Sequence, residues 1–283
     1  MERIEPSRAE WNTWTFGAPL QQSWAYGETA RTLGSRVERY AVGPASDPDA
    51  VVQFVRRFGV GYAPVGVHYR RPGSYAARLP GLTLIAEPAG RAVSTARQVA
   101  VRRLDGDLRA GMAKKWRNRL HVAERSDLRI HRIAGCPRWL SEAEAAQRSA
   151  RGYKALPLAW LRGMIAADSC GVLTYAAFSG ALPVAGICVL RHSGRWTYHL
   201  GWTGPDGRSR SAHHLLIATA MEDAAKAGAV LFDLGLVTAQ NEGLRRFKLG
   251  TGAEAVTIPG MTIGWRLSAR GGRRASAPAC RAA

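Results

Sequence analysis

The sequence predicts an α/β (α+β) fold with a substantial hydrophobic core. The chain has 283 residues, 46% of them hydrophobic, and segments of helical period alternate with short apolar strands along its length. This length fits two small domains or one large one. No apolar run approaches the ~20 residues of a membrane-spanning helix. Residues 1–6 lack the apolar stretch of a secretion signal, so we expect a cytoplasmic protein.

The first third of the chain reads as short strands and turns around one helix. We expect a helix over residues 20–34 and strands over residues 37–42, 60–67, 82–85 and 99–104. Residues 37–42 alternate apolar and polar side chains, which is the period of a half-buried strand.

A long basic helix is expected over residues 107–126, with Asp105 or Asp107 as its N-cap. Its apolar stripe has helical spacing and consists of Leu108, Met112, Trp116, Leu120 and Ala123. Its other faces carry the densest cationic stretch of the chain, five basic residues within twelve positions: Lys114, Lys115, Arg117, Arg119 and Arg125. A strand over residues 128–133 is expected to follow.

The second half begins near Pro137 and reads as alternating helices and strands. We expect helices over residues 138–151, 157–168, 211–227 and 241–249, and strands over residues 172–178, 183–190, 195–202, 229–235, 255–258 and 262–266. Gly180 and Gly194 lie in short links between the first three of these strands, which favours antiparallel hairpins. This order of elements is similar to the layout of the GNAT N-acyltransferases.

Charge and cysteine usage limit the classes of partner. Lys and Arg number 40 against 21 Asp and Glu, which gives a formal net charge of +19. A basic field of this size attracts polyanions such as nucleic acid, phosphorylated small molecules or an anionic membrane surface. The four cysteines form no C-x-x-C pair, so we expect neither a metal site nor a disulfide framework.

Residues 204–211 form the candidate phosphate loop, because they precede a predicted helix whose N-terminus would favour an anion. Coenzyme-A-dependent GNAT proteins usually show Arg/Gln-x-x-Gly-x-Gly/Ala at this place. Here the third residue after Arg208 is Ser211, so the close backbone approach that glycine permits is missing.

Several segments in the correct order resemble the Fem family of peptidoglycan aminoacyltransferases. The segments are Ala212-His213-His214-Leu215-Leu216, Phe232-Asp233-Leu234-Gly235, and the run over residues 241–254 that contains Gly243-Leu244, Phe247-Lys248 and Gly250-Thr251-Gly252. The Lys-x-Arg-x-x-Leu-x-x-Ala motif of the family is matched by Lys115, Arg117, Leu120 and Ala123, and residues 21–25 approximate its Gln-x-x-x-Trp-Ala.

The resemblance implies two GNAT-like halves with mixed sheets, the first of them degenerate. We expect an N-terminal half over residues 1–135 that includes the basic helix, a C-terminal half over residues 136–268, and a basic disordered tail over residues 269–283. The implied reaction moves an aminoacyl group from charged tRNA to an amine and needs no cofactor. Glu28 stands four residues after Trp24, where members that act on nucleotide-linked muropeptide carry lysine, which argues against that acceptor. The amino acid, the acceptor amine and the oligomeric state stay open.

The resemblance also assigns the site. Lys248 matches the family lysine that reaches the acyl carbonyl, where a fixed cation lowers the barrier by about 3 kcal/mol. Asp233 could orient the attacking amine or cap the next turn. The donor phosphates are assigned to basic residues of two helices: Lys115, Arg117, Arg119, Arg245 and Arg246. The pocket residues are Phe247, Asn241, which could instead cap its helix, and Trp202.

Two other functions stay open. One is an acyl-CoA-dependent N-acyltransferase, and the other is a non-catalytic protein that binds nucleic acid or an anionic surface on the same scaffold. Lys248 favours an enzyme, because the chain has only five lysines and one of them occupies the motif position. His213 and His214 have no carboxylate or cysteine at ligand spacing, so we expect them to cap or pack.

Overall fold

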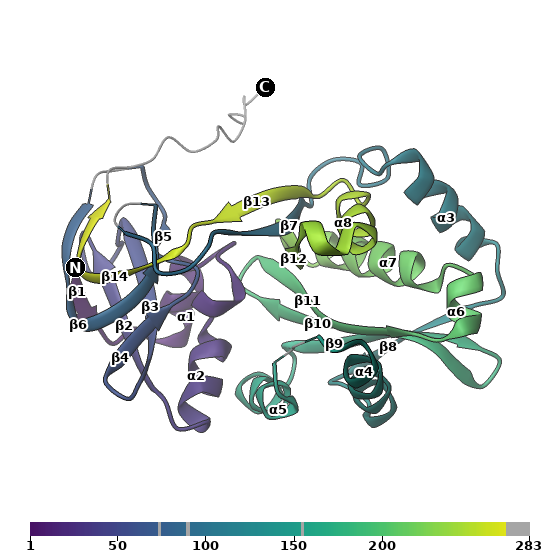
Figure 1. The fold of residues 1–283 in the computed structure, drawn as a ribbon, viewed down its shortest axis with the longest axis horizontal. Coiled ribbons are helices and arrows are strands. Elements are labelled where there is room, and N and C mark those ends of the chain that lie inside the picture. The colour runs from purple at the N-terminus through teal and green to yellow at the C-terminus, as the bar shows by residue number, and fades with distance from the viewer. Residues whose placement is uncertain (73–74, 89–90, 154–155, 270–283) are drawn as a thin grey trace.

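The computed structural model describes residues 1–72, 75–88, 91–153 and 156–269. Two sheets, sheet A and sheet B, lie next to each other, with helices against both (Figure 1). Both sheets contain parallel and antiparallel pairs, so the predicted α/β fold with two mixed sheets is confirmed. Of the predicted tail, residue 269 ends the last strand and residues 270–283 lie outside the described residues. No helix in the described part of the chain is long and apolar enough to cross a membrane.

Sheet A has the strand order β1-β2-β3-β4-β6-β14, with β5 paired to β3. Its strands are β1 Glu2–Ile4, β2 Arg36–Val42, β3 Ala50–Arg57, β4 Val60–Ala63, β5 His68–Tyr69, β6 Tyr75–Ala86 and β14 Met261–Ala269. The β4–β6 pair is parallel and the others are antiparallel. The helices before β2 are α1 Arg8–Trp14, the single turn η1 Leu20–Gln22 and α2 Trp24–Thr32. Trp11 and Trp14 of α1 pack against Val51 of β3 and close one face of the sheet.

Sheet B has the order β13-β7-β12-β11-β10-β9-β8. Its strands are β7 Arg97–Arg103, β8 Arg129–Ala134, β9 Val172–Ser179, β10 Leu182–His192, β11 Arg195–Thr203, β12 Leu231–Val237 and β13 Glu254–Ile258. The β11–β12 pair is parallel and the others are antiparallel.

Helices cover sheet B from both sides. α3 Lys114–Glu124, α7 Ala212–Lys226 and α8 Glu242–Leu249 lie over one face, where a core cluster includes Trp116, Leu216 and Phe232. α4 Arg138–Arg151 and α5 Leu158–Ala167 lie over the other, around Leu140 and Leu161. The remaining elements are the short helix α6 Pro205–Ser209 and the single turn η2 Ala239–Asn241.

The helix predicted over residues 107–126 begins only at Lys114. Asp107 accepts hydrogen bonds from the backbone N–H groups of Arg109 (2.8 Å) and Ala110 (3.2 Å), which fixes a turn in place of the first helical turns. Arg117 then donates to the carbonyl groups of the same two residues. The loop before α3 is therefore held by the side chains of Asp107 and Arg117, both of which were predicted to lie on the helix.

The sheets divide the chain differently from the predicted boundary after residue 135. β7 pairs with β12 and β13, β8 pairs with β9, and α3 packs against α7, so these elements belong to the second half. β14 pairs with β6 and returns the end of the chain to sheet A. The predicted boundary cuts between β8 and its partner strand because it follows sequence order rather than strand pairing.

Several elements had no counterpart among the predictions, and the longest of them are β3 and α1. The helix α1 has a signal that could have revealed it: Ser7 and Glu10 form a capping box, in which each side chain bonds the backbone N–H of the other residue.

We expect Gly207→Ala to lower the free energy of unfolding by about 1–3 kcal/mol. A methyl group on Gly207 would lie well inside van der Waals contact with the carbonyl oxygen of Val184, so α6 or β10 must shift. Gly243→Ala is the control, because nothing lies within 4 Å of the added methyl on α8. Urea denaturation measures both variants, and equal midpoints would contradict the expectation.

Candidate active site

Sheet B opens between its two parallel strands. β11 and β12 pair only over residues 195–197 and 231–233, although β11 continues to Thr203 and β12 to Val237. We call the opening beyond Thr197 and Asp233 the fork. α7 starts at the end of the loop that follows β11, and α8 follows β12, so both helices bring side chains to the fork.

A bulge in each strand produces the fork. On β11, Tyr198 pairs with Val189 and Leu200 pairs with Cys188, which leaves His199 as an extra residue. On β12, Asp233 pairs with Val101 and Gly235 with Ala100, which leaves Leu234 as an extra residue. Each bulge directly follows the paired segment, so the two strands separate at the same level.

The β11 bulge changes which face each aromatic side chain occupies. Trp196 and Tyr198 contact the α7 cluster, whereas Leu200 and Trp202 contact the α4 and α5 cluster. The ring of Trp202 lies 6.2 Å from that of Trp139 on α4. Trp202 therefore lies on the opposite face of the sheet from Phe247, and its predicted place in the same pocket is wrong.

A buried ion pair joins the first paired residue of β11, Arg195, to the last paired residue of β12, Asp233. Arg195 donates to one carboxylate oxygen of Asp233 at 2.6 Å, with side chains 8% and 11% exposed. The other oxygen accepts from the backbone N–H of Gly235 at 2.7 Å. Gly235 has φ +77°, which favours glycine, so the carboxylate also fixes the β12 bulge. Both oxygens of Asp233 are thus engaged within the protein.

Lys248 lies at the fork. It is 7% exposed, and its ammonium group donates to the carbonyl oxygen of Leu236 at 2.8 Å. Burial lowers the pKa of Lys248 to about 8, and the attraction of Asp233 opposes part of that shift. Among the described residues, Leu236 supplies the one acceptor within hydrogen-bond distance, so the other N–H bonds of the ammonium remain available to a ligand.

Aromatic rings from two other helices, α3 and α7, surround Phe247 of α8. Its ring lies 5.5 Å from that of His213, 5.0 Å from that of His214 and 6.0 Å from that of Trp116. His213 is bonded through one ring nitrogen to Thr203 (2.8 Å) and through the other to the hydroxyl of Tyr198 (3.3 Å). His213 therefore packs at the fork, and Phe247 lies at the junction of α3, α7 and α8.

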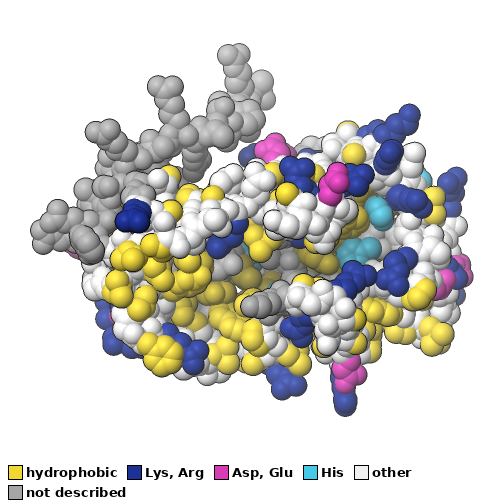
Figure 2. Space-filling model, in the orientation of Figure 1, with side chains coloured by type: hydrophobic (Ala, Val, Ile, Leu, Met, Phe, Trp, Pro, Cys, Tyr) yellow, Lys and Arg dark blue, Asp and Glu magenta, His cyan; other side chains and the backbone are white. Residues whose placement is uncertain are grey.

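The two histidines are uncharged at neutral pH. Burial, with a smaller effect of His214, lowers the pKa of His213 to about 4. Burial, followed by the positive charge of Arg119, lowers the pKa of His214 to about 4. Figure 2 shows histidine side chains on the floor of a hollow whose rim carries Lys and Arg side chains.

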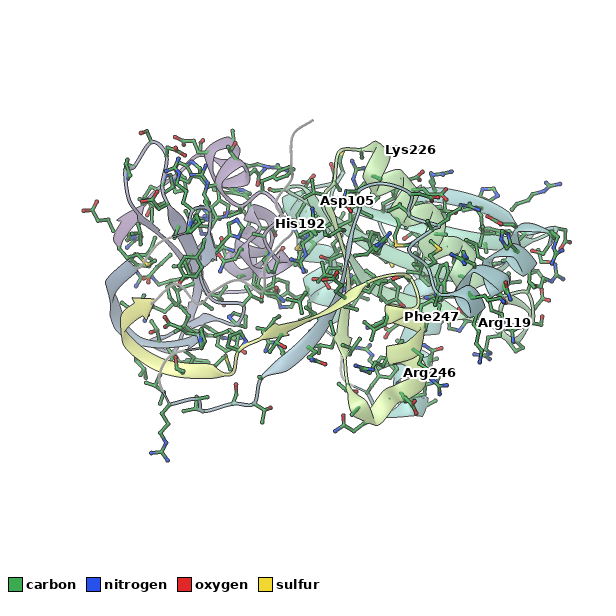
Figure 3. All side chains as sticks on the ribbon, turned by 90° about the horizontal axis from the view of Figure 1, so that it is seen from above. Asp105, Arg119, His192, Lys226, Arg246 and Phe247 are labelled. Carbon is green, nitrogen blue, oxygen red and sulfur yellow. The ribbon has the colours of Figure 1, made fainter. Side chains whose placement is uncertain are left out.

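The basic residues that were predicted to bind the donor phosphates differ in exposure and in the partners they already have. Lys115 and Arg119 are exposed on α3, whereas Arg117 is occupied with backbone carbonyl groups. On α8, Arg245 is half-buried and Arg246 is exposed, 3.7 Å from Glu242. Figure 3 places Arg119, Arg246 and Phe247 on one side of the second half and Lys226 on the other.

Asn241 caps α8, because its side chain accepts a hydrogen bond from the backbone N–H of Leu244 at 3.1 Å. This is the capping role that the sequence offered as the alternative to a pocket residue. The residue is exposed.

The predicted phosphate loop is folded into α6. Backbone N–H groups of Arg208, Arg210 and Ser211 donate to carbonyl groups within the same segment. The N–H of His214 donates to the carbonyl of Ser211. These amides are consequently not available to hold a pyrophosphate.

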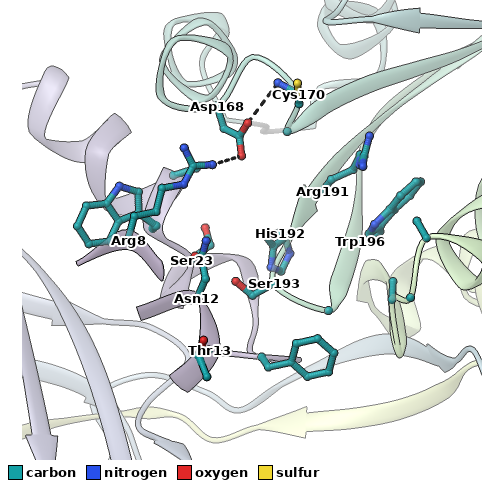
Figure 4. Close-up of a pocket in the computed structure, with 18 residues that line it drawn as sticks. Arg8, Asn12, Thr13, Ser23, Asp168, Cys170, Arg191, His192, Ser193 and Trp196 are labelled. Atoms are coloured by element: carbon teal, nitrogen blue, oxygen red, sulfur yellow. Dashed lines mark hydrogen bonds and ion pairs between the residues drawn. The ribbon is translucent and has the colours of Figure 1, made fainter. Parts of the chain in front are cut away.

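One pocket lies between α1, α2 and the turn from β10 to β11 (Figure 4). Arg8 reaches Asp168 there at 2.6 Å, and Arg191 stacks 4.9 Å from the ring of Trp196. The turn is at the opposite end of β11 from the fork, and the lining includes neither Lys248 nor Asp233. This pocket is therefore separate from the fork.

Arg195 and Tyr198 had no assignment as site residues in the sequence prediction. The pairing of Arg195 with Asp233 depends on the parallel register of strands that a helix separates in sequence, so no local signal predicts it. Tyr198 carried a weak signal, since it lies two residues from Trp196 on the same predicted strand.

A family model described as an acetyltransferase (GNAT) domain matches residues 106–255, more than half of the 283 residues. The chain belongs to the GNAT acetyltransferase family. The matched segment contains α3, the fork, α7 and α8. The predicted enzyme class, an acyltransferase of GNAT fold, is confirmed at this level. A search of curated proteins gave no significant match.

Solved structures show that this GNAT chain shares its whole fold with known proteins. FemX is 12% identical with a TM-score of 0.71, over 94% of this chain and 98% of FemX. A conserved protein of unknown function from Bacteroides thetaiotaomicron is 14% identical with a TM-score of 0.57, over 93% of this chain and 99% of that protein. The C-terminal domain of a putative lysylphosphatidylglycerol synthetase from Agrobacterium fabrum is 13% identical with a TM-score of 0.51, over 91% of this chain and 92% of that domain. The predicted resemblance to the Fem family is confirmed at the level of the fold.

We expect Asp233→Asn to lower the free energy of unfolding by about 3 kcal/mol, because it leaves the Arg195 guanidinium buried without its counter-charge. Glu142→Gln is the control, since its pair with Arg138 is exposed and its loss should cause no measurable change. Chemical denaturation of both variants tests the expectation. An Asp233→Asn variant as stable as the unmodified chain would show that the pair does not hold the fork.

Proposed function

We propose that the chain transfers an aminoacyl group from charged tRNA to an acceptor amine in the cytoplasm. The observation that carries the proposal is the buried ammonium group of Lys248 at the fork of a GNAT sheet, next to Phe247. The fold shared with FemX and the motif resemblance to the aminoacyl-tRNA-dependent Fem family support it. In this proposal the acceptor is any small molecule or peptide that presents a neutral amine.

The reaction forms an amide and breaks an ester. The acceptor nitrogen attacks the carbonyl carbon of the aminoacyl ester, a C–N bond forms, and the C–O bond to the ribose breaks. The ribose oxygen takes up the proton that the amine loses. Because an ester is already activated, the protein supplies position and charge rather than a strong base.

Each residue at the fork has a proposed role. Lys248 donates to the oxyanion of the tetrahedral intermediate, and its pKa of about 8 keeps it mostly protonated at neutral pH. Phe247, with His213 and His214, forms the wall against which the aminoacyl group lies. Asp233 acts as a positioning residue through Arg195 and the β12 bulge, because both its oxygens are engaged.

The phosphate loop favours tRNA over coenzyme A as the donor. The backbone amides that would hold a pyrophosphate instead donate to carbonyl groups within α6 and the turn after it. Lys115 and Arg119, in contrast, present exposed charges on α3, which contacts α8 through Trp116 and Phe247. Exposed cations of this kind hold the phosphate backbone of a nucleic acid.

The decisive experiment supplies the full chain with a labelled aminoacyl-tRNA pool and cell extract, and in parallel with labelled acetyl-CoA. We expect label to move from tRNA to an amine product. Binding of tRNA should weaken with salt by about 0.9 units of log–log slope per phosphate contact.

Arg119→Gln should lower this slope by about one unit. Arg138→Gln, on the opposite face of sheet B, should leave it unchanged. Transfer from acetyl-CoA without transfer from aminoacyl-tRNA would contradict the proposed donor.

We expect Lys248→Ala to lower turnover by about 10²–10³-fold, because the oxyanion loses its cation. In the unmodified enzyme kcat/KM should also fall as pH rises through about 8, where Lys248 loses its proton. Lys248→Arg should be slower than the unmodified enzyme but lack this fall, since guanidinium stays protonated.

Lys226→Ala is the matched control, because this exposed lysine lies in the last turn of α7 on the other side of the molecule (Figure 3). Steady-state kinetics across pH 6–10 measure all four proteins. Equal turnover of the Lys248→Ala and Lys226→Ala variants would rule out the catalytic role.

A further inference from the structure

One face of sheet A carries an exposed row of apolar side chains. On this face Tyr62 of β4 pairs with Leu84 of β6, and Leu84 pairs with Ile263 of β14. Tyr62 is 37% exposed and Ile263 is 50% exposed, and Leu82, two residues before Leu84, is 50% exposed. We call Tyr62, Leu82, Leu84 and Ile263 the apolar row.

Helix α2 covers this face over β2 and β3. Arg39 and Gln53 lie beneath α2, where a side chain at Gly27 would strike both of them. The face continues past the edge of α2 across β4, β6 and β14, where the apolar row begins. Half-exposed apolar side chains in register on three adjacent strands are uncommon in a protein without a partner.

The apolar surface extends into the second half of the molecule. The ring of Tyr26 on α2 lies 4.4 Å from that of Trp160 on α5. Burial raises the pKa of Tyr26 to about 12, and the hydroxyl of Tyr62 adds to the shift. Leu158, at the start of α5, is 42% exposed. Figure 2 shows apolar side chains gathered over β4, β6 and β14 and continuing to the central hollow.

The charges around this surface are basic. Arg57 lies on the same face as Tyr62. Val55 and Arg57 are two residues apart on β3 and so share a face, and Val55 pairs directly with Tyr62. It is exposed, and no acidic side chain of the described chain pairs with it. Arg162 on α5 is also exposed, and Figure 2 shows Lys and Arg side chains at the margins of the apolar area.

We propose that this face docks on the surface of an anionic lipid bilayer. Apolar side chains enter the head-group region of a bilayer while basic side chains attract anionic lipids, and both kinds are present here. A nucleic acid would use the basic margin but not the apolar row. Two copies of the chain would repel each other, because each carries a formal net charge of +19.

Docking would turn the central hollow toward the membrane, since the hollow and the apolar area share one face (Figure 2).

Flotation of the full chain with lipid vesicles tests the docking. The vesicles contain phosphatidylcholine alone or with phosphatidylglycerol, and neither donor nor acceptor is added. We expect the chain to float with the anionic vesicles and not with the neutral ones. Ile263→Asp and Leu82→Asp should each weaken this binding by about 10-fold, because an inserted apolar side chain is lost and a like charge is added.

Leu182→Asp is the matched control. Leu182 is 71% exposed at the start of β10, outside the apolar row, and its substitution changes the net charge by the same amount. Binding of this variant should equal that of the unmodified chain. Because all three substituted positions are at least half exposed, the variants should keep the unmodified unfolding midpoint.

Three results would overturn the proposal. The first is an unmodified chain that does not float with anionic vesicles. The second is equal weakening by Ile263→Asp and Leu182→Asp, which would assign binding to net charge alone. The third is a change of oligomeric state on Ile263→Asp without vesicles, which would assign the row to a contact between copies. Vesicle binding without any transfer activity would refute the proposed function and leave docking intact.

Discussion

One buried ion pair joins β11 to β12 over the short segment that precedes the fork. Arg195 opens the paired segment on β11 and Asp233 closes it on β12, so the ion pair reaches along the whole length of the parallel pairing. The same carboxylate accepts from the backbone of Gly235 and so stabilises the turn of β12 away from its neighbour. A charged pair in this place is stronger than a neutral hydrogen bond, because water is excluded around it. Lys248 lies in the opening that begins beyond this pair, and Phe247 stands next to it on α8.

Much of the second half could be predicted because its signals are local. α4 occupies the predicted residues 138–151, and the hairpins around Gly180 and Gly194 form as their turn residues indicate. The start of α3 was missed because side-chain contacts that helical periodicity does not report decide it. Asp107 and Arg117 bond the backbone of the loop, and Arg102 fills the space beside Gly111. No periodicity within residues 107–113 reports these contacts.

In the candidate site, too, local motifs predict the place of some residues and not of others. The place of Lys248 and Phe247 on one short helix follows from their motif, and the capping role of Asn241 follows from its position before that helix. The partner of Asp233 and the face of Trp202 could not be predicted, because both depend on a register between strands. One extra residue, His199, reverses the facing of every later side chain on β11.

The last strand has a consequence for the way the protein is made. β14 completes sheet A, and Thr83 on β6 bonds the backbone of Gly264, 181 positions later in the chain. During synthesis the N-terminal half therefore leaves the ribosome with β6 as an unpaired edge, and it waits for nearly the entire second half to be translated. An edge of this kind recruits other strands. We therefore expect the edge of β6 to be the part of a nascent or C-terminally truncated chain that is most prone to pair with other chains.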